Sequence, residues 1–163
     1  MADREGETGG LTISAAEWRQ IVDSAVDTAI ITTDREGRIT SWSEGACRIL
    51  GWSEAEMRGQ SLARLFPDNV GAEAIAAEMR DAQRRGRGGG EEGWRQRKDG
   101  KLIWAAGELT PIRDSTSEVT GFTKVLRDRS RQREAEEQLS EERRNPEIRN
   151  RAGSARARET DRH

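Results

Sequence analysis

The sequence contains almost none of the side chains that carry out chemistry near neutral pH. Of its 163 residues, one is histidine, one is cysteine and none is tyrosine. The histidine is the last residue, His163, so a Ser-His-Asp or Cys-His arrangement would have no base inside a fold. Cys47 is the only thiol, which excludes an internal disulfide and a zinc site built from Cys and His. We therefore expect a non-enzymatic protein without a metal site, and the lone cysteine suits a cytoplasmic location.

Long apolar runs and an excess of one charge are missing as well. No run approaches the ~18 apolar residues that a membrane-spanning helix needs. The 28 basic and 30 acidic residues leave a formal net charge of −2, which disfavours a role in nucleic-acid binding. We expect neither a membrane nor a nucleic acid among the partners.

Charge divides the chain into a core and polar ends. All five Trp and both Phe precede residue 127, and the residues that follow are dominated by Arg, Asp and Glu. The first residues are acidic and rich in Gly. We expect a disordered lead at 1–13, a folded domain at 14–127 that includes an N-terminal helix, a charged exit helix at 128–145 and a disordered tail at 146–163.

The hydrophobic pattern of the folded part predicts both helices and strands. Ser14, with Glu17 three residues later, forms a capping box for a first helix. Residues 29–33 and 39–42 predict a hairpin, Ser43 and Ser53 begin short helices, and residues 72–84 form another helix. Three strands are expected at 94–97, 102–112 and 119–127. Because short turns join consecutive strands, the fold class is α+β, with a five-stranded antiparallel sheet and short helices on one face.

Two glycine-containing stretches receive different interpretations. Residues 84–93 are expected to form a flexible loop. Residues 88–93 satisfy GxGxxG, but a helix precedes them and a strand follows, the reverse of a dinucleotide site. Asp99 and Gly100 predict a three-residue hairpin turn with Gly in the left-handed region. This turn places Trp94 and Trp104 on one face of the sheet, and on the other face it places Arg95, Ile103, Ala105 and Leu109.

The order of elements resembles a PAS domain, and several local stretches support the resemblance. Residues 30–42 resemble the opening hairpin of the family, 49–59 its helical connection, and 97–100, 110–114 and 121–122 its closing strands. Asp128-Arg129-Ser130 stands where the family has a hinge into a signalling helix, so Asp128 and Ser130 are the candidate hinge. The resemblance covers residues 15–140. It implies a bacterial PAS sensory module, as found N-terminal to histidine kinases and in GAF-containing sensors.

The resemblance also implies a cavity between sheet and helices that holds haem, flavin, a small metabolite or nothing. In flavin photoreceptors with a cysteine adduct, Leu62 occupies the cysteine position, and Arg95 and Ala105 replace two flavin-binding amides. Haem-binding members carry a proximal histidine on the long helix, and Ala74 stands near the corresponding position in this chain. We expect no tightly held cofactor, keep non-covalent flavin as an alternative and disfavour haem. The candidate pocket lining comprises Ile31, Thr33, Ile49, Leu62, Leu65, Arg95, Ile103, Ala105 and Leu109.

Trp18, Trp94 and Trp104 are interpreted as one packing cluster on the outer face of the sheet, where the family docks its N-terminal helix or a second subunit. The exit helix offers only Ala135 and Leu139 to a coiled-coil seam. The chain is either a piece of a larger sensor or a stand-alone PAS protein.

The predicted function is a cytoplasmic, non-enzymatic sensory and dimerisation module of bacterial signal transduction. It forms a homodimer and relays a conformational change through its C-terminal helix to an output domain or partner protein absent from this chain. Two alternatives remain: a non-covalent flavin-binding redox or light sensor, and a cofactor-free scaffold for protein interactions.

Overall fold

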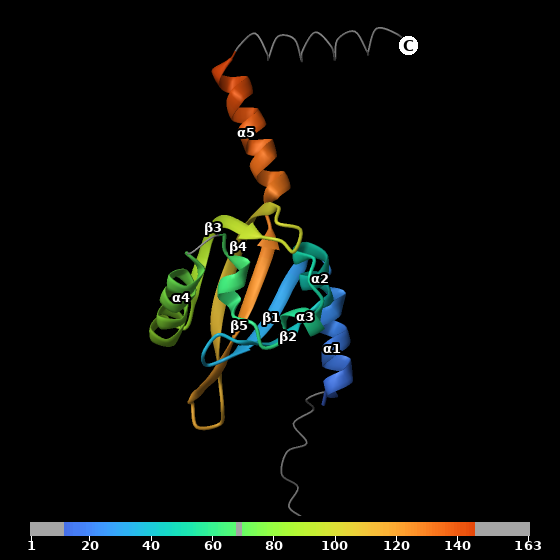
Figure 1. The fold of residues 1–163 in the computed structure, drawn as a ribbon, viewed down its shortest axis with the longest axis vertical. Coiled ribbons are helices and arrows are strands. Elements are labelled where there is room, and N and C mark those ends of the chain that lie inside the picture. Colours follow the sequence, from blue (N-terminus) through green and yellow to red (C-terminus); the bar gives the residue numbers. More distant parts are fainter. Residues whose placement is uncertain (1–11, 68–69, 146–163) are drawn as a thin grey trace, which may run out of the picture.

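Five antiparallel strands form one sheet in the order β2-β1-β5-β4-β3. The structure is a computed structural model that describes residues 12–67 and 70–145 (Figure 1). Most of the predicted lead and the whole predicted tail therefore lie outside the described residues. The strands are β1 (Thr28–Asp34), β2 (Ile39–Trp42), β3 (Gly88–Gln96), β4 (Leu102–Arg113) and β5 (Val119–Asp128). The predicted α+β class and the five-stranded sheet are confirmed.

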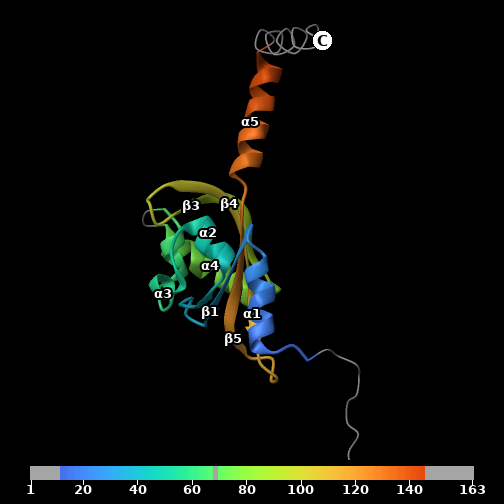
Figure 2. The same cartoon turned by 90° about the vertical axis from the view of Figure 1, so that its right-hand side faces the viewer.

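Apart from the last one in the chain, the helices divide between the two faces of the sheet. They are α1 (Ala15–Ser24), α2 (Glu44–Leu50), α3 (Glu54–Met57), η1 (Leu62–Leu65), α4 (Gly71–Arg85) and α5 (Ser130–Arg144). Figure 2 shows α1 on the opposite side of the sheet from α2, α3 and α4. The hydroxyls of Ser14, Ser43 and Ser53 each accept a hydrogen bond from the third following amide, as the sequence predicts for N-caps. No helix in the described part of the chain is long and apolar enough to cross a membrane.

The predicted loop at residues 84–93 is wrong, because most of it is strand. Helix α4 continues to Arg85, Gly86 ends it with φ 81°, and β3 begins at Gly88. The reason is a close approach of backbones, since a Cβ at Gly88 would lie 2.0 Å from the carbonyl oxygen of Glu78 in α4. The glycines therefore let the edge strand pass beneath α4, and they do not mark a loop.

The hairpin that joins β3 to β4 has the predicted turn. Gly100 has φ 82°, and the Arg97 amide donates to the Lys101 carbonyl at 2.9 Å. Trp94 pairs with Trp104, and the next pair toward the turn is Arg95 with Ile103. The Trp pair consequently faces outward, whereas Arg95 faces the core.

The hydrophobic core lies between the inner face of the sheet and helices α2 to α4. Its largest fully buried side chain is that of Trp42, whose indole Nε1 donates to the Trp52 carbonyl at 2.8 Å, so the buried donor is satisfied. Phe122 and Leu126 contribute from β5 at alternate positions, as a strand with one buried face requires.

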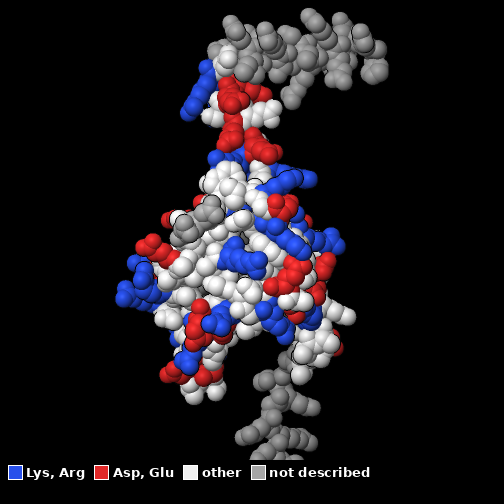
Figure 3. Space-filling view, viewed as in Figure 1, with Lys and Arg blue, Asp and Glu red and all other residues white. Residues whose placement is uncertain are grey.

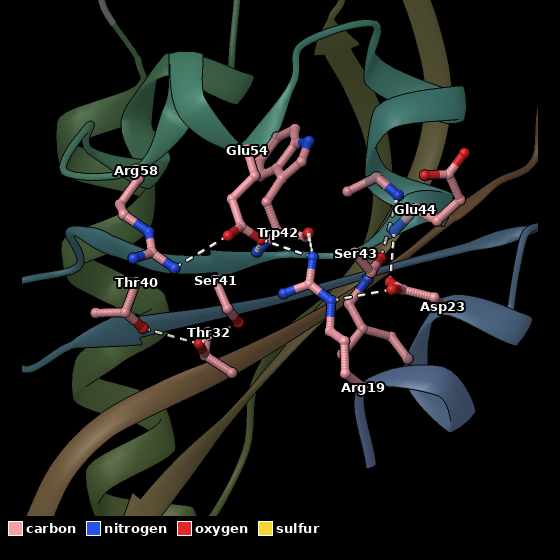
Figure 4. Close-up of polar contacts among 12 residues, drawn as sticks. Arg19, Asp23, Thr32, Thr40, Ser41, Trp42, Ser43, Glu44, Glu54 and Arg58 are labelled. Atoms are coloured by element: carbon pink, nitrogen blue, oxygen red, sulfur yellow. Dashed lines mark hydrogen bonds and ion pairs between the residues drawn. The ribbon is translucent and has the colours of Figure 1, made fainter. Parts of the chain in front are cut away.

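Helix α1 is attached to the sheet by an ionic network around Arg19 (Figure 4). The guanidinium contacts Asp23 at 2.9 Å, Glu54 at 2.8 Å and the Trp42 carbonyl at 3.1 Å. Asp23 in turn accepts from the Glu44 amide at 3.0 Å. Partial burial raises the pKa values of Asp23 and Glu54, but these hydrogen bonds outweigh it and lower both values overall.

The Arg19→Met substitution should destabilise the protein at neutral pH by about 1 kcal/mol and weaken its acid sensitivity. Because the folded-state pKa values of Asp23 and Glu54 lie below their ordinary values, their stabilisation is complete at higher pH and is lost on acidification through that range. Denaturant unfolding followed by Trp fluorescence between about pH 7 and 3 measures both effects. The control is Arg48→Met, which breaks an exposed Arg–Glu pair at 3.5 Å. An equal effect in both variants would contradict the prediction.

Candidate functional site

The exit helix α5 is attached to β4 through the main chain of one residue, Trp104. The Arg129 amide donates to the Trp104 carbonyl at 2.7 Å, and the Trp104 amide donates to the Ser130 hydroxyl at 3.2 Å. The Ser130 amide donates to the Asp128 carboxylate at 2.9 Å. Both predicted hinge residues therefore lie at the junction of sheet and helix, and Asp128 is the last residue of β5.

Aromatic side chains hold the first turn of α5 from the outer face of the sheet. The rings of Trp94 and Trp104 meet edge to face, with centroids 5.0 Å apart. The guanidinium of Arg133 lies 3.9 Å from the Trp104 centroid and 4.7 Å from that of Trp94, which is cation–π geometry. We call Trp94, Trp104 and Arg133, together with Glu92 and Arg129, the helix clamp.

Within the clamp, Glu92 of the edge strand β3 links Trp104 to Arg129. Its carboxylate accepts a hydrogen bond from the Trp104 indole Nε1 at 2.8 Å and forms an ion pair with Arg129 Nε at 3.3 Å. Arg129 lies between the two hinge residues, and this ion pair and a hydrogen bond from Arg129 to Gln132 fix its position.

Beyond its first turn, α5 projects away from the body in both views (Figures 1 and 2). No residue of α5 is buried, and Leu139 is 55% exposed. The direction of the helix therefore depends on the hinge and the clamp.

The predicted cluster of three Trp is divided between two places on the outer face. Trp18 lines a cavity of about 400 Å³ between α1 and the sheet, together with Ile112 of β4. Ile112 lies eight residues from Trp104 along β4, about 27 Å of extended strand. Within one chain, Trp18 is thus separate from the Trp94–Trp104 pair, so the three do not form the single cluster that was predicted. Their role in a dimer stays a prediction, with Trp18 and the Trp94–Trp104 pair as two separate contacts.

The inner face of the sheet carries a buried ionic pair that the sequence reasoning missed. Lys124 of β5 is 1% exposed, and its ammonium group pairs with Glu78 of α4, which is 12% exposed. Burial lowers the pKa of Lys124, Glu78 opposes this shift, and Arg95 adds to it. A Cβ at Gly107 would lie 2.6 Å from Lys124 Cε, so that glycine provides the space for the side chain. The inward alternation of Phe122, Lys124 and Leu126 was the signal available in the sequence.

Arg95 is the second buried cation. Its guanidinium lies 4.3 Å from the Phe66 ring centroid, and Nη1 donates to the Trp94 carbonyl at 3.1 Å. Burial lowers its pKa, and Glu78 opposes that shift. Lys124 and Arg95 thus share one neighbouring carboxylate, which leaves one positive charge in excess.

All nine residues predicted to line a pocket are buried. Arg95 lines a cavity of about 350 Å³ between α4 and β3, and Ile49 lines another at the base of α5. Leu62 is fully buried and has no thiol, whereas Cys47, the only thiol, lies in α2, where burial raises its pKa. These residues do not fit a covalent flavin site. The described residues also contain no cluster of His, Cys, Asp and Glu suited to a metal ion.

The fold and the clamped exit helix define a class of domain: an antiparallel sheet with short helices over one face, an N-terminal helix on the other and an outgoing helix after its central strand. The family model described as PAS fold matches residues 16–129, and the chain belongs to the PAS family. Among solved structures, it is similar to the PAS domain of a protein from Colwellia psychrerythraea, with TM-score 0.65 and 22% identity, covering 71% of this chain and 97% of that one. An RNA-binding light-oxygen-voltage receptor gives TM-score 0.66 at 21% identity, covering 85% and 40%. At these identities the likeness concerns the fold alone.

Two curated relatives carry the names of signalling proteins. Two-component system protein A of Emericella nidulans is 34% identical over 124 residues, which are 73% of this chain and 17% of that protein. Sensor histidine kinase TmoS of Ectopseudomonas mendocina is 27% identical over 134 residues, 80% of this chain and 13% of that protein. The chain spans less than a fifth of the length of either relative.

Proposed function

We propose that this chain is a cytoplasmic, non-enzymatic PAS sensory module that passes a conformational bias through α5 to an output domain or partner protein of a two-component system. The observation that carries the proposal is the attachment of α5, which contacts the sheet only through its first turn. Two states of such a helix need differ by only a few kcal/mol for a ligand or partner to shift them.

The β3–β4 hairpin provides a route from the core to the clamp. Arg95 and Ile103 point into the core, while their chain neighbours Trp94 and Trp104 hold α5 from outside. Arg95 also donates to the carbonyl of Trp94. A change in the core that shifts Arg95 or Ile103 therefore also moves the indole rings of Trp94 and Trp104.

The relatives support an output by phosphotransfer, because their names are those of a two-component protein and a sensor histidine kinase. This chain matches a small part of each, and the proposal assigns the kinase activity to the remainder of such a protein. Figure 3 shows charges of both signs scattered over the visible face, in keeping with a protein partner.

Joining residue 144 of the chain to the kinase region of a sensor histidine kinase by a continuous helix tests the relay. Arg133→Gln removes the cation from the clamp, so basal autophosphorylation should change about two- to fivefold, the equivalent of an exposed cation–π contact. Arg143→Gln, which removes the same charge from the last turn of the same helix, is the matched control and should leave the activity unchanged. Equal activities of all three fusions, or an equal change in the control, would reject the relay.

The proposal includes a homodimer in which a second copy covers the apolar residues that α1 leaves exposed. Trp18 is 60% exposed, and Ile21, three residues further on the same helix face, is also exposed. Aromatic side chains of this kind anchor protein interfaces.

Trp18→Glu should therefore shift the protein toward monomer, with an increase in the dimer dissociation constant of about tenfold or more. Gln20→Glu adds the same charge to an exposed position of α1 on the opposite face and should leave the dimer intact. Light scattering across a concentration series measures the molar mass. A wild-type mass of one chain at high concentration would refute the dimer.

We extend the proposal to a module without a tightly bound cofactor, supported by Leu62 and Arg95 at positions where flavin proteins of the family carry a thiol and an amide. The absorption spectrum of the purified protein should contain only the near-ultraviolet band of its Trp side chains. A flavin band would favour the alternative of a non-covalent flavin sensor, and a Soret band would favour haem. If the spectrum shows no cofactor and Arg133→Gln leaves the activity of the kinase fusion unchanged, the alternative of a cofactor-free scaffold for protein interactions would be favoured.

A further inference from the structure

The cavity between α4 and the edge strand β3 is lined by several charged side chains that have no ion-pair partner among the described residues. Its inner part is formed by Arg95, which is 5% exposed. Arg95 Nε is buried and makes no hydrogen bond within the described residues, and none of their carboxylates forms an ion pair with this guanidinium. A buried cation without a paired carboxylate is costly, so the part of the guanidinium that lines the cavity is suited to an anionic group from outside the chain.

The rim of the same cavity has the opposite charge. Asp81 and Glu91 line it, are exposed, and form no ion pair in the part of the chain that the structure describes. Glu78 and Glu92 also line it, but they pair with Lys124 and Arg129 respectively. The free carboxylates at the rim would repel a simple anion and attract a cationic group.

The cavity also has an apolar part to its lining. Phe66, Ala74 and Ala77 line it, and the cavity volume is about 350 Å³. A ligand that matches all three zones has a carboxylate, a short apolar part and an ammonium group.

From these three zones we infer that the cavity binds a small zwitterion of the α-amino-acid class. Its carboxylate accepts hydrogen bonds from Arg95, its side chain packs on Phe66, and its ammonium group faces Asp81 and Glu91. The bound carboxylate contacts the guanidinium of Arg95 where it lines the cavity and offsets the excess positive charge of Arg95 and Lys124.

Glu92 would report the occupancy of the cavity to α5. It lines the cavity and at the same time holds the Trp104 indole and Arg129 of the clamp. This coupling rests on the proposed relay, whereas the binding does not.

Titration calorimetry on the full chain tests the binding with L-alanine, L-valine and L-leucine as probes. Two analogues of valine separate its charges: 3-methylbutanoate lacks the ammonium group, and 2-methylpropan-1-amine lacks the carboxylate. We expect at least one amino acid to bind, and both analogues to bind about tenfold or more weakly than valine, because each loses one charge-assisted contact. Absence of binding by all three amino acids at millimolar concentration would overturn the inference, as would equal binding of either analogue.

Variants assign the binding to the named residues. Arg95→Gln should abolish binding, and circular dichroism shows whether this buried substitution leaves the fold intact. The exposed pair Asp81→Asn and Glu91→Gln should weaken valine binding while leaving the affinity for 3-methylbutanoate unchanged or higher. Since this double variant alters only the rim, it decides the question even if Arg95→Gln fails to fold. Unchanged valine affinity in the double variant would refute the assigned orientation.

The kinase fusion separates this inference from the relay. If valine binds the chain but leaves the autophosphorylation of the fusion unchanged, while Arg133→Gln also has no effect, the relay fails and the binding site stands. If Arg133→Gln changes the activity and no amino acid binds, the relay stands and the zwitterion site is refuted.

Discussion

The register of the β3–β4 hairpin decides what lies on each side of the sheet. Because side chains alternate along a strand, a slip of β3 by one residue against β4 would bring Trp94 into the core and expose Arg95. The positive φ of Gly100 gives the turn that sets this register. The place of Arg95 in the core and that of the Trp94–Trp104 pair in the helix clamp both depend on this register, because these residues are neighbours on the same two strands.

The core accommodates two cations at a cost that packing alone does not explain. Taking Lys124 out of water costs several kcal/mol, and pairing with one carboxylate recovers only part of it. Apolar residues of similar volume would stabilise such a site as well or better. Gly107 leaves the space that Lys124 fills, so the local backbone is fitted to the charged side chain. A site that uses the excess charge to hold a ligand gives that arrangement a function.

Local signals in the sequence predicted most of the fold. Serine caps, the hairpin turn and strand alternation each act over a few residues, so Ser14, Gly100 and the inward face of β4 were placed correctly. The glycines before Trp94 were misread, because their reason is the passage of α4 over the strand, a contact between distant parts of the chain. The pairing of Lys124 with Glu78 and the stacking of Arg133 on two indoles are also long-range, and no local pattern indicates which charges will meet.

The weakness of the α5 attachment is what suits it to a relay. The helix buries no residue, and Ala135 and Leu139 provide too short a seam to fix it against a second helix. Its orientation is thus held by two hydrogen bonds to the main chain of Trp104, one of them from the main chain of Arg129 and the other to the Ser130 hydroxyl, and by the exposed clamp, contacts worth about 1 kcal/mol each. A more deeply buried helix would need a larger input to move. Because the contacts that hold α5 are few, their total free energy is small. A change at Glu92 or in the β3–β4 hairpin is then comparable in energy to the difference between two orientations of α5. A ligand of modest affinity is therefore sufficient to shift the helix from one orientation to the other.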